Sequence, residues 1–172
     1  MGIHRLNHAV LYVRDVDASV AFYNGVLGFT TKTAFPGAAF LQAPGSTNDH
    51  DLGLFEVGQQ AVANPAGKGS VGLYHLAWEV ENLDDLEAHM HKLSEAGALV
   101  GMSDHGSTKS LYAKDPDGIE FEVVWLIPAN LLTGDEAIDS RPKPLDLEKE
   151  KARYGGQTRG GIGISIPVGV SA

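Results

Sequence analysis

The chain has 172 residues and a formal net charge of −9 at pH 7, with 13 Lys and Arg against 22 Asp and Glu. A surface this acidic repels phosphates, which argues against nucleic acid or an anionic membrane as a partner. Cysteine is absent, so disulfides, thiolate metal ligands and a cysteine nucleophile are excluded, while seven histidines leave room for metal or acid–base chemistry. The sequence predicts neither a signal peptide nor a membrane span, and we expect a cytoplasmic protein.

A repeat organises the chain. LNHAVLYVRDVDASVAFYNGVLGF, which starts at Leu6, matches LYHLAWEVENLDDLEAHMHKLSEAGA, which starts at Leu73. This alignment brings His8 onto His75. Each copy begins with an alternating strand, continues through a helix that starts at Asp or Asn, and closes at a glycine.

Three short β-like stretches follow each predicted helix, and turn residues separate them. They are FTTKTAF, AAFLQA and HDLGLFEV in the first copy, and ALVGMSD, KSLYAKD and GIEFEVVWLI in the second. The sequence therefore predicts an α+β fold of two tandem β-α-β-β-β modules, which form a cupped mixed sheet with the helices on its outer face.

The composition indicates where the modules begin and end. We predict the first module at residues 1–57 and the second at 71–127, and the small, polar stretch 58–70 is typical of a linker. Residues 128–172 are rich in Gly, Pro and Ser around one charged stretch, PLDLEKEKARYG, that favours a short helix. We expect a C-terminal arm over the surface or over a neighbouring subunit, disordered in part.

Strand alternation places three metal-ligating side chains on one face of the predicted sheet. His8 and His75 lie at equivalent positions of the repeat, on the side away from the apolar residues that would face the helices. Glu122 shares that face, because the residues on either side of it in its strand are apolar. Glu120 also points there, but it follows the turn DPDG and Ile119, and we expect it at the rim in water.

The two copies differ at the fourth position of such a site. The repeat aligns Glu122 with Gly53, which carries no ligand. Two imidazoles and one carboxylate match a site that binds Fe(II) or Mn(II) and leaves positions open for substrate. One histidine alone would more often be structural, but the shared face and the repeat favour a metal. A bulge could turn Glu56 inward as a fourth ligand, and this alternative stays open.

The motifs HAVLYV, HLAWEV and DPDGIEFE resemble the vicinal oxygen chelate superfamily, to which glyoxalase I, fosfomycin-resistance proteins, bleomycin-binding proteins and type I extradiol dioxygenases belong. The resemblance covers most of the chain apart from the C-terminal tail. The segment from His105 through Tyr112 to Glu122 is similar to the extradiol dioxygenase signature. HDLGLF, which starts at His50, resembles the segment that carries the acid–base histidine of that family.

The resemblance implies a non-haem Fe(II)-dependent extradiol dioxygenase that cleaves a catechol-type ring with O2. Its metal ligands would be His8, His75 and Glu122. His50 would act as the acid–base group, because a histidine can take and return a catechol proton near neutral pH. Tyr112 would hydrogen-bond the substrate oxygen, and His105 would support it. Short superfamily members are commonly dimers, so we expect a homodimer or higher homo-oligomer whose metal site forms within one chain or across two.

Other interpretations stay open. A glyoxalase I-like lyase needs Glu56 as a fourth ligand. A fosfomycin-type metal-dependent transferase needs a cationic pocket, for which only Lys109 and Lys114 are near. A metal-free small-molecule binding module is the third alternative, although such relatives usually lack the metal ligands that this chain retains. The predicted catalytic residues also have structural interpretations. His50 and His105 could be turn histidines, and Tyr112 could be a core tyrosine.

Overall fold

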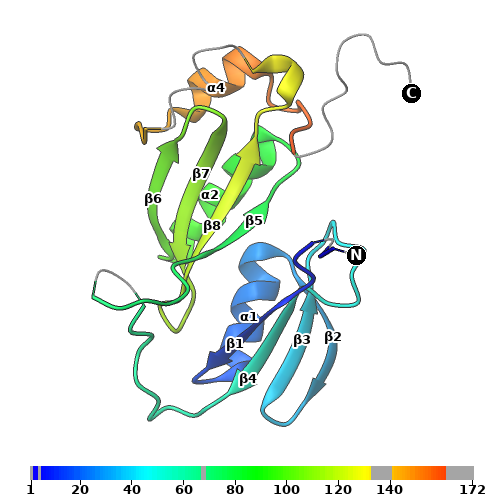
Figure 1. Cartoon of the computed structure of the whole chain (residues 1–172), viewed down its shortest axis with the longest axis vertical. Coiled ribbons are helices and arrows are strands. Elements are labelled where there is room, and N and C mark those ends of the chain that lie inside the picture. Colours follow the sequence, from blue (N-terminus) through cyan, green and yellow to red (C-terminus); the bar gives the residue numbers. More distant parts are fainter. Residues whose placement is uncertain (1, 4, 67–68, 133–140, 162–172) are drawn as a thin grey trace. The chain divides into compact units, whose positions relative to one another are not determined.

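A computed structural model describes residues 2–3, 5–66, 69–132 and 141–161. The chain divides into two compact units, each with its own sheet (Figure 1). The first unit contains Met1–Pro65 and Asp115–Ile119, and the second contains Ala66–Lys114 and Glu120–Ala172. The chain therefore leaves the second unit for one short turn and then returns to it.

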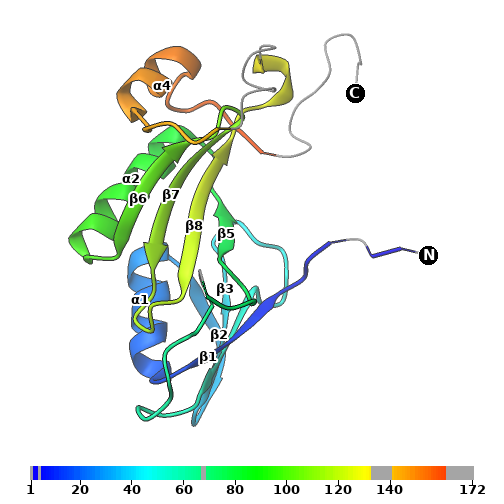
Figure 2. The ribbon, with the colours of Figure 1, turned by 60° about the vertical axis from the view of Figure 1, so that its left-hand side comes forward.

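The first unit is a four-stranded mixed sheet with one helix. Its elements are β1 (Ala9–Val13), α1 (Val16–Leu27), β2 (Thr30–Phe35), β3 (Ala38–Gln42) and β4 (Leu52–Glu56). The strand order is β1-β4-β3-β2, and only β1 and β4 run parallel. The carboxylate of Asp15 accepts a hydrogen bond from Ala18 N at 2.9 Å and so caps the start of α1. The helix packs on one face of the sheet (Figure 2).

The second unit repeats this arrangement and adds a C-terminal segment. Its elements are β5 (Leu76–Glu79), α2 (Leu83–Glu95), β6 (Leu99–Asp104), β7 (Thr108–Lys114), β8 (Glu120–Leu126), the 3-10 helix η1 (Ala129–Leu131) and α4 (Leu147–Tyr154). The order β5-β8-β7-β6, with only β5 and β8 parallel, matches the first sheet. Helix α2 packs on one face of this sheet, and α4 packs against α2 (Figure 2).

The predicted α+β fold is confirmed, with two β-α-β-β-β modules in the predicted order. The module boundaries at 57, 70 and 127 stay a prediction. Residues 67–68 of the predicted linker, and 133–140 and 162–172 of the predicted arm, lie outside the described residues. Within the described part of the chain, none of the helices has the length and apolar character needed to cross a membrane.

The turn that precedes β8 is anchored in the first unit. Arg14 binds the Asp117 carboxylate twice, through Nη1 at 2.9 Å and through its backbone N–H at 3.0 Å. The Tyr23 hydroxyl donates to Asp115 Oδ2 at 3.2 Å. Burial raises the pKa of the Asp115 carboxyl, which the surrounding hydrogen bonds partly offset. The start of the strand that carries Glu122 is therefore set by contacts made far from it in sequence.

The C-terminal segment is bound to the second unit by a buried cation. Lys109 on β7 is 1% exposed, and its ammonium lies 2.6 Å from Asp104 Oδ1 and 3.1 Å from Glu150 Oε2 on α4. Its strand neighbours Leu111 and Ala113, which point to the same side, are completely buried. Lys109 thus belongs to the packed side of the sheet, where two carboxylates compensate its charge.

Candidate active site

The packed and polar sides of β8 separate as the sequence predicts. Phe121, Val123 and Trp125 are at most 2% exposed, whereas the alternate residues Glu120 and Glu122 are only partly buried. This distribution follows from strand alternation, since the apolar set lies under the helix side of the sheet. The carboxylates therefore point to the opposite, open face of the second unit.

Pairing between β7 and β8 adds a phenol to this open face. Tyr112 is the direct partner of Glu122 across the two antiparallel strands, so both side chains point to the same side. The Tyr112 hydroxyl donates to Glu122 Oε1 at 3.4 Å and lies 2.9 Å from His105 Nε2. Tyr112 is thus a polar residue of the open face, and the core-packing alternative does not hold.

His75 contacts the other oxygen of the Glu122 carboxylate. The His75 Nε2 atom lies 3.2 Å from Glu122 Oε2, and the two side chains are 25% and 12% exposed. Four of the six predicted site residues therefore form one continuous row of contacts: His75, Glu122, Tyr112 and His105. All four belong to the second unit.

The environment keeps Tyr112 protonated. Burial raises the pKa of its hydroxyl, and the negative charge of Glu122 raises it further. A phenol that keeps its proton at neutral pH can donate a hydrogen bond to an anionic oxygen. Because His105 contacts the same hydroxyl oxygen, it restricts the direction in which Tyr112 donates.

The spacing of His75 and Glu122 fits two ligands of one divalent metal. Metal–ligand bonds of about 2.1 Å at a right angle place two ligand atoms about 3.0 Å apart. The observed 3.2 Å between Nε2 and Oε2 is close to this value. The His75 ring is held between Tyr74 and Tyr112, with ring centroids at 4.6 and 5.8 Å. The imidazole is therefore orientated before any metal binds.

Glu120, which was expected at the rim in water, has a partner that the sequence did not indicate. Its side chain is partly buried on the open face. A hydrogen bond to Glu120 is the largest cause that raises the pKa of the Tyr74 hydroxyl. Glu120 therefore contacts Tyr74, the residue whose ring lies against that of His75.

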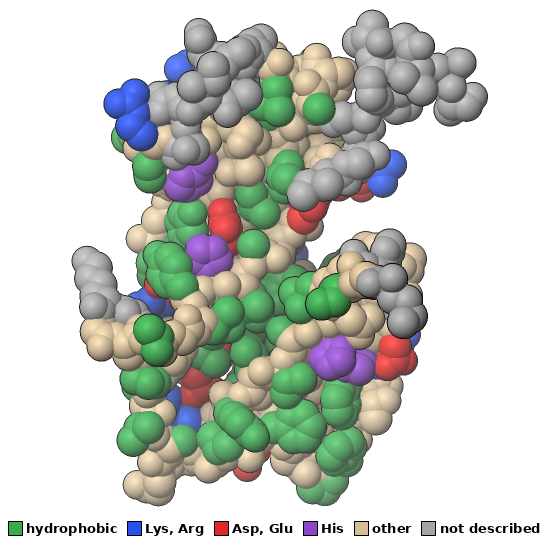
Figure 3. Space-filling model, viewed as in Figure 1, with side chains coloured by type: hydrophobic (Ala, Val, Ile, Leu, Met, Phe, Trp, Pro, Cys, Tyr) green, Lys and Arg blue, Asp and Glu red, His purple; other side chains and the backbone are tan. Residues whose placement is uncertain are grey.

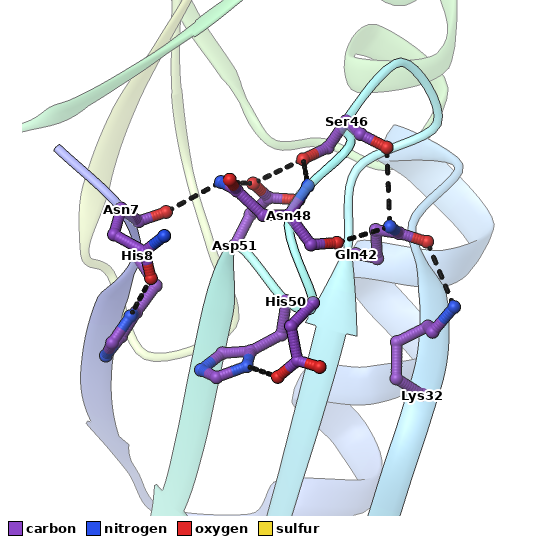
Figure 4. Close-up of polar contacts among 9 residues, drawn as sticks. Asn7, His8, Lys32, Gln42, Ser46, Asn48, His50 and Asp51 are labelled. Carbon is purple, nitrogen blue, oxygen red and sulfur yellow. Dashed lines mark hydrogen bonds and ion pairs between the residues drawn. The ribbon is translucent and has the colours of Figure 1, made fainter. Parts of the chain in front are cut away.

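The first unit brings the other two predicted residues together. His8 lies directly before β1 and His50 directly before β4, and their ring centroids are 4.6 Å apart (Figure 4). His8 Nδ1 lies 2.8 Å from Asn7 Oδ1, and His50 Nδ1 lies 2.7 Å from Asp49 Oδ2. With both Nδ1 atoms acting as donors to oxygen, both Nε2 atoms are left as bases or ligands.

Gly53 takes the place of Glu122 in the first unit. Gly53 pairs with Val10 on the neighbouring parallel strand, as Glu122 pairs with Ala77. A Cβ atom at Gly53 would lie 3.4 Å from Val10 Cγ2 and 3.5 Å from Phe40 Cε1. An aromatic ring therefore covers the position at which the second unit carries its carboxylate.

Glu56 has a different role from a fourth ligand. It shares the packed side of β4 with Leu52 and Leu54, both completely buried, and the pairing of β4 with its neighbours runs without a shift. Its Oε2 atom accepts a hydrogen bond from Val16 N at 3.0 Å, at the first turn of α1. The bulge that would turn Glu56 inward is not found in this strand, and the carboxylate stabilises the helix start.

The predicted metal ligands are divided between the units. His8 belongs to the first unit, and His75 and Glu122 belong to the second. Within residues 2–3, 5–66, 69–132 and 141–161, three or more His, Asp or Glu side chains do not come together as a metal-binding group. In Figure 3, histidine side chains lie at the surface among apolar side chains, with acidic side chains close to them. The three-ligand site stays a prediction.

Two contacts of the histidines were missed by sequence reasoning. Tyr74 packs on His75, and Asp49 pairs with His50. Each of these residues directly precedes the histidine that it contacts. Adjacency to a candidate ligand was the only signal in the sequence that could have found them.

Comparison with known proteins agrees with the fold. The family model described as the Glyoxalase/Bleomycin resistance protein/Dioxygenase superfamily matches residues 5–123. Over 118 residues the chain is 31% identical to a catechol-2,3-dioxygenase of Bacillus subtilis, with 69% of this chain and 40% of that protein covered. Over 143 residues it is 32% identical to biphenyl-2,3-diol 1,2-dioxygenase 3 of Rhodococcus globerulus, with 78% and 68% covered. The chain therefore spans less than half of the first relative.

A solved structure supports the fold at lower identity. The lactoylglutathione lyase from Agrobacterium tumefaciens is 23% identical, with a TM-score of 0.54, and the match covers 72% of this chain and 95% of that one. At this identity the likeness concerns the fold alone.

The row of contacts in the second unit predicts a change in tyrosine titration. Glu122→Gln should lower the pKa of Tyr112, because the variant removes the nearby negative charge that raises it. Glu120→Gln should instead lower the pKa of Tyr74. NMR titration of metal-free protein with labelled tyrosine rings would resolve the two residues. An unchanged Tyr112 pKa in Glu122→Gln would contradict the contact.

Proposed function

The chain belongs to the glyoxalase/bleomycin resistance protein/dioxygenase superfamily, and from this we propose that it is a non-haem Fe(II)-dependent extradiol dioxygenase acting on a catechol-type aromatic. The observation that carries the proposal is the row of contacts from His75 through Glu122 and Tyr112 to His105. These are the residue types that the extradiol signature implies, in the same sequence order. The two dioxygenase relatives, above 30% identity, support the same reaction class.

The proposed metal ligands are His8, His75 and Glu122. Two neutral imidazoles and one carboxylate suit Fe(II), with Mn(II) as the alternative, and leave coordination positions free on one side. The iron would supply a Lewis acid that binds the diol and O2 together. The contact between His75 and Glu122 supports this assignment, because its length fits two adjacent ligands of one ion.

Tyr112 has the properties of a hydrogen-bond donor to the substrate. A tyrosine hydroxyl is protonated at neutral pH, burial raises its pKa further here, and Tyr112 lies on the open face beside Glu122. We propose that Tyr112 donates a hydrogen bond to the substrate oxygen next to the carbon–carbon bond that breaks. His105 holds the phenol from its other side, at 2.9 Å, and limits its rotation.

His50 is the proposed acid–base residue. Its Nδ1 atom is bound by Asp49, so its Nε2 atom can accept a proton from the catechol hydroxyl and later return it. The neighbouring ring of Phe40, with centroids 5.0 Å apart, packs edge-on against the imidazole and restricts its position. A proton acceptor next to a proposed metal ligand, His8, matches what catechol binding requires.

Two alternatives are weakened by contacts already described. A glyoxalase I-like lyase would need Glu56, whose carboxylate binds the start of α1. A fosfomycin-type transferase would need a cationic pocket, but Lys109 is buried on the packed side and is bound by Asp104 and Glu150. We further propose that the protein acts as a cytoplasmic homodimer or higher homo-oligomer on a small catecholic substrate and O2.

The reaction class can be tested by colour. Protein loaded with Fe(II) without oxygen, then mixed with a catechol and O2, should turn yellow, because cleavage beside the diol gives a coloured ring-opened product. Absorbance across a panel of catechols would measure this. If the whole panel stayed uncleaved while a methylglyoxal–thiol adduct was turned over, the dioxygenase proposal would be wrong.

The choice of carboxylate can be tested by metal content. Glu122→Ala should release the iron, because it removes a proposed ligand, whereas Glu120→Ala should keep most of it. Elemental analysis of the two purified variants would compare them, with thermal unfolding as a check that both are folded. Comparable loss of iron from both variants would show that Glu122 is not the distinguishing ligand.

A further inference from the structure

We propose that Asp51 and Asn48 form a positioning network that holds the imidazoles of His8 and His50 side by side. All of its contacts lie within the first unit (Figure 4). Its relevance to metal binding rests on the proposed function, in which His8 is a ligand and His50 the acid–base residue. The side-by-side placement of the two rings is a separate claim and can be tested without a metal.

The Asp51 carboxylate is buried and accepts several hydrogen bonds from the loop before β4. The residue is 9% exposed. Its Oδ1 atom accepts hydrogen bonds from Ser46 Oγ and Asn48 Nδ2, both at 2.7 Å, and its Oδ2 atom accepts one from Ala43 N at 2.8 Å. Three donors to one buried carboxylate fix both the loop and the side chain, because removing the acceptor would leave the donors unsatisfied.

The backbone of Asp51 reaches the residue next to His8. Its carbonyl accepts a hydrogen bond from Ala9 N at 2.9 Å, and its own N–H donates to Leu41 O at 2.8 Å. Ala9 directly follows His8, and Asp51 directly follows His50. Asp51 therefore links the two histidines, because it follows His50 in the chain and binds the backbone of the residue that follows His8.

Asn48 fixes His8 from the other side. Its Nδ2 atom donates to Asn7 O at 2.8 Å as well as to Asp51. Asn7 directly precedes His8, and its side-chain oxygen lies 2.8 Å from His8 Nδ1. His8 is exposed and lies before the first residue of β1. The strand ladder alone does not hold it, and the bonds to Asn7 and Ala9 on either side supply the restraint.

Strands β2 and β3 also hold this loop through hydrogen bonds. Gln42, the last residue of β3, donates from Nε2 to Ser46 O at 3.3 Å and to Asn48 O. Lys32 on β2 donates to Gln42 Oε1 at 3.3 Å. Asn48 is thus held from both directions, and its contact with Asn7 is built on a fixed loop. Such supporting contacts, one step removed from a ligand, commonly change metal affinity by about 10- to 100-fold when they are lost.

The test uses two variants of the network in metal-free protein. Asp51→Asn cannot accept all three hydrogen bonds, and Asn48→Ala removes the link to Asn7. In both variants, the nuclear Overhauser contact between the His8 and His50 ring protons should disappear, and the Ala9 amide should exchange about 10-fold faster as its bond loosens. Asn48→Ala is the milder change, and it decides the question if Asp51→Asn does not fold.

Two matched substitutions in the same unit serve as controls. Asp15→Asn changes a carboxylate that caps α1, where Asn caps about as well as Asp. Asn24→Ala removes a side chain that bonds only Thr31 among the contacts described. Both controls should keep the contact between the rings and the slow exchange of Ala9.

Metal affinity then tests the role of the network. Titration calorimetry with Mn(II) should show a dissociation constant raised about 10-fold or more in Asn48→Ala and Asp51→Asn, and unchanged in the two controls. His8→Ala provides the reference. If His8→Ala binds Mn(II) as tightly as the natural protein, His8 is not a metal ligand and the proposed metal site is wrong. The contact between the His8 and His50 rings then remains as the test of whether the network positions them. If His8→Ala loses the metal while folded network variants keep the ring contact or the affinity, the positioning role is overturned.

Discussion

The Glu122 carboxylate organises the open face of the second unit. One of its oxygens meets His75 and the other accepts from Tyr112, whose hydroxyl also contacts His105. The arrangement depends on a constraint of β-sheets, that residues paired directly across two strands point to the same side. The buried residues on either side of Glu122 leave it only this direction. Phenol, carboxylate and imidazole are therefore held together by the pairing of the strands.

The two repeats have diverged from one plan at this point. Both sheets have the same strand order and the same parallel pair, yet Gly53 stands where the second unit has Glu122. Phe40 covers the glycine, and the carboxylate of Glu56, the candidate for a fourth ligand, is used at the start of α1. The first unit therefore has no carboxylate at the strand position where the second unit has Glu122. This difference is in line with the proposal of three protein ligands in place of four.

Strand periodicity was sufficient to predict the fold and the position of Glu122 on the open face, whereas it left the side of Tyr112 open. Period-2 alternation assigns each residue to a side, and the turn at DPDG sets where the strand begins. The repeat also identified Gly53 correctly as the residue of the first unit that is equivalent to Glu122. It could do so because the length differences between the two copies fall outside the paired strands. These are local properties, and local properties can be found in a sequence.

Contacts between distant residues were not predicted. The hold of Arg14 on Asp117, the pairing of Lys109 with Glu150, and the link from Asn48 to Asn7 join residues far apart in the chain. A pattern of hydrophobicity contains no record of such partners. The contact of Glu120 with Tyr74 was missed for a related reason, since the two residues are far apart in the chain and Tyr74 lies before the first residue of β5.

We propose that His8, His75 and Glu122 hold the metal and leave the rest of its coordination open. A crystal structure of the protein loaded with Fe(II) in the absence of oxygen tests it most directly. We expect iron bound by the His8 and His75 imidazoles and by the Glu122 carboxylate, with water at the remaining positions. Iron bound by a fourth protein ligand such as Glu56, or by a set that leaves out Glu122, would contradict it.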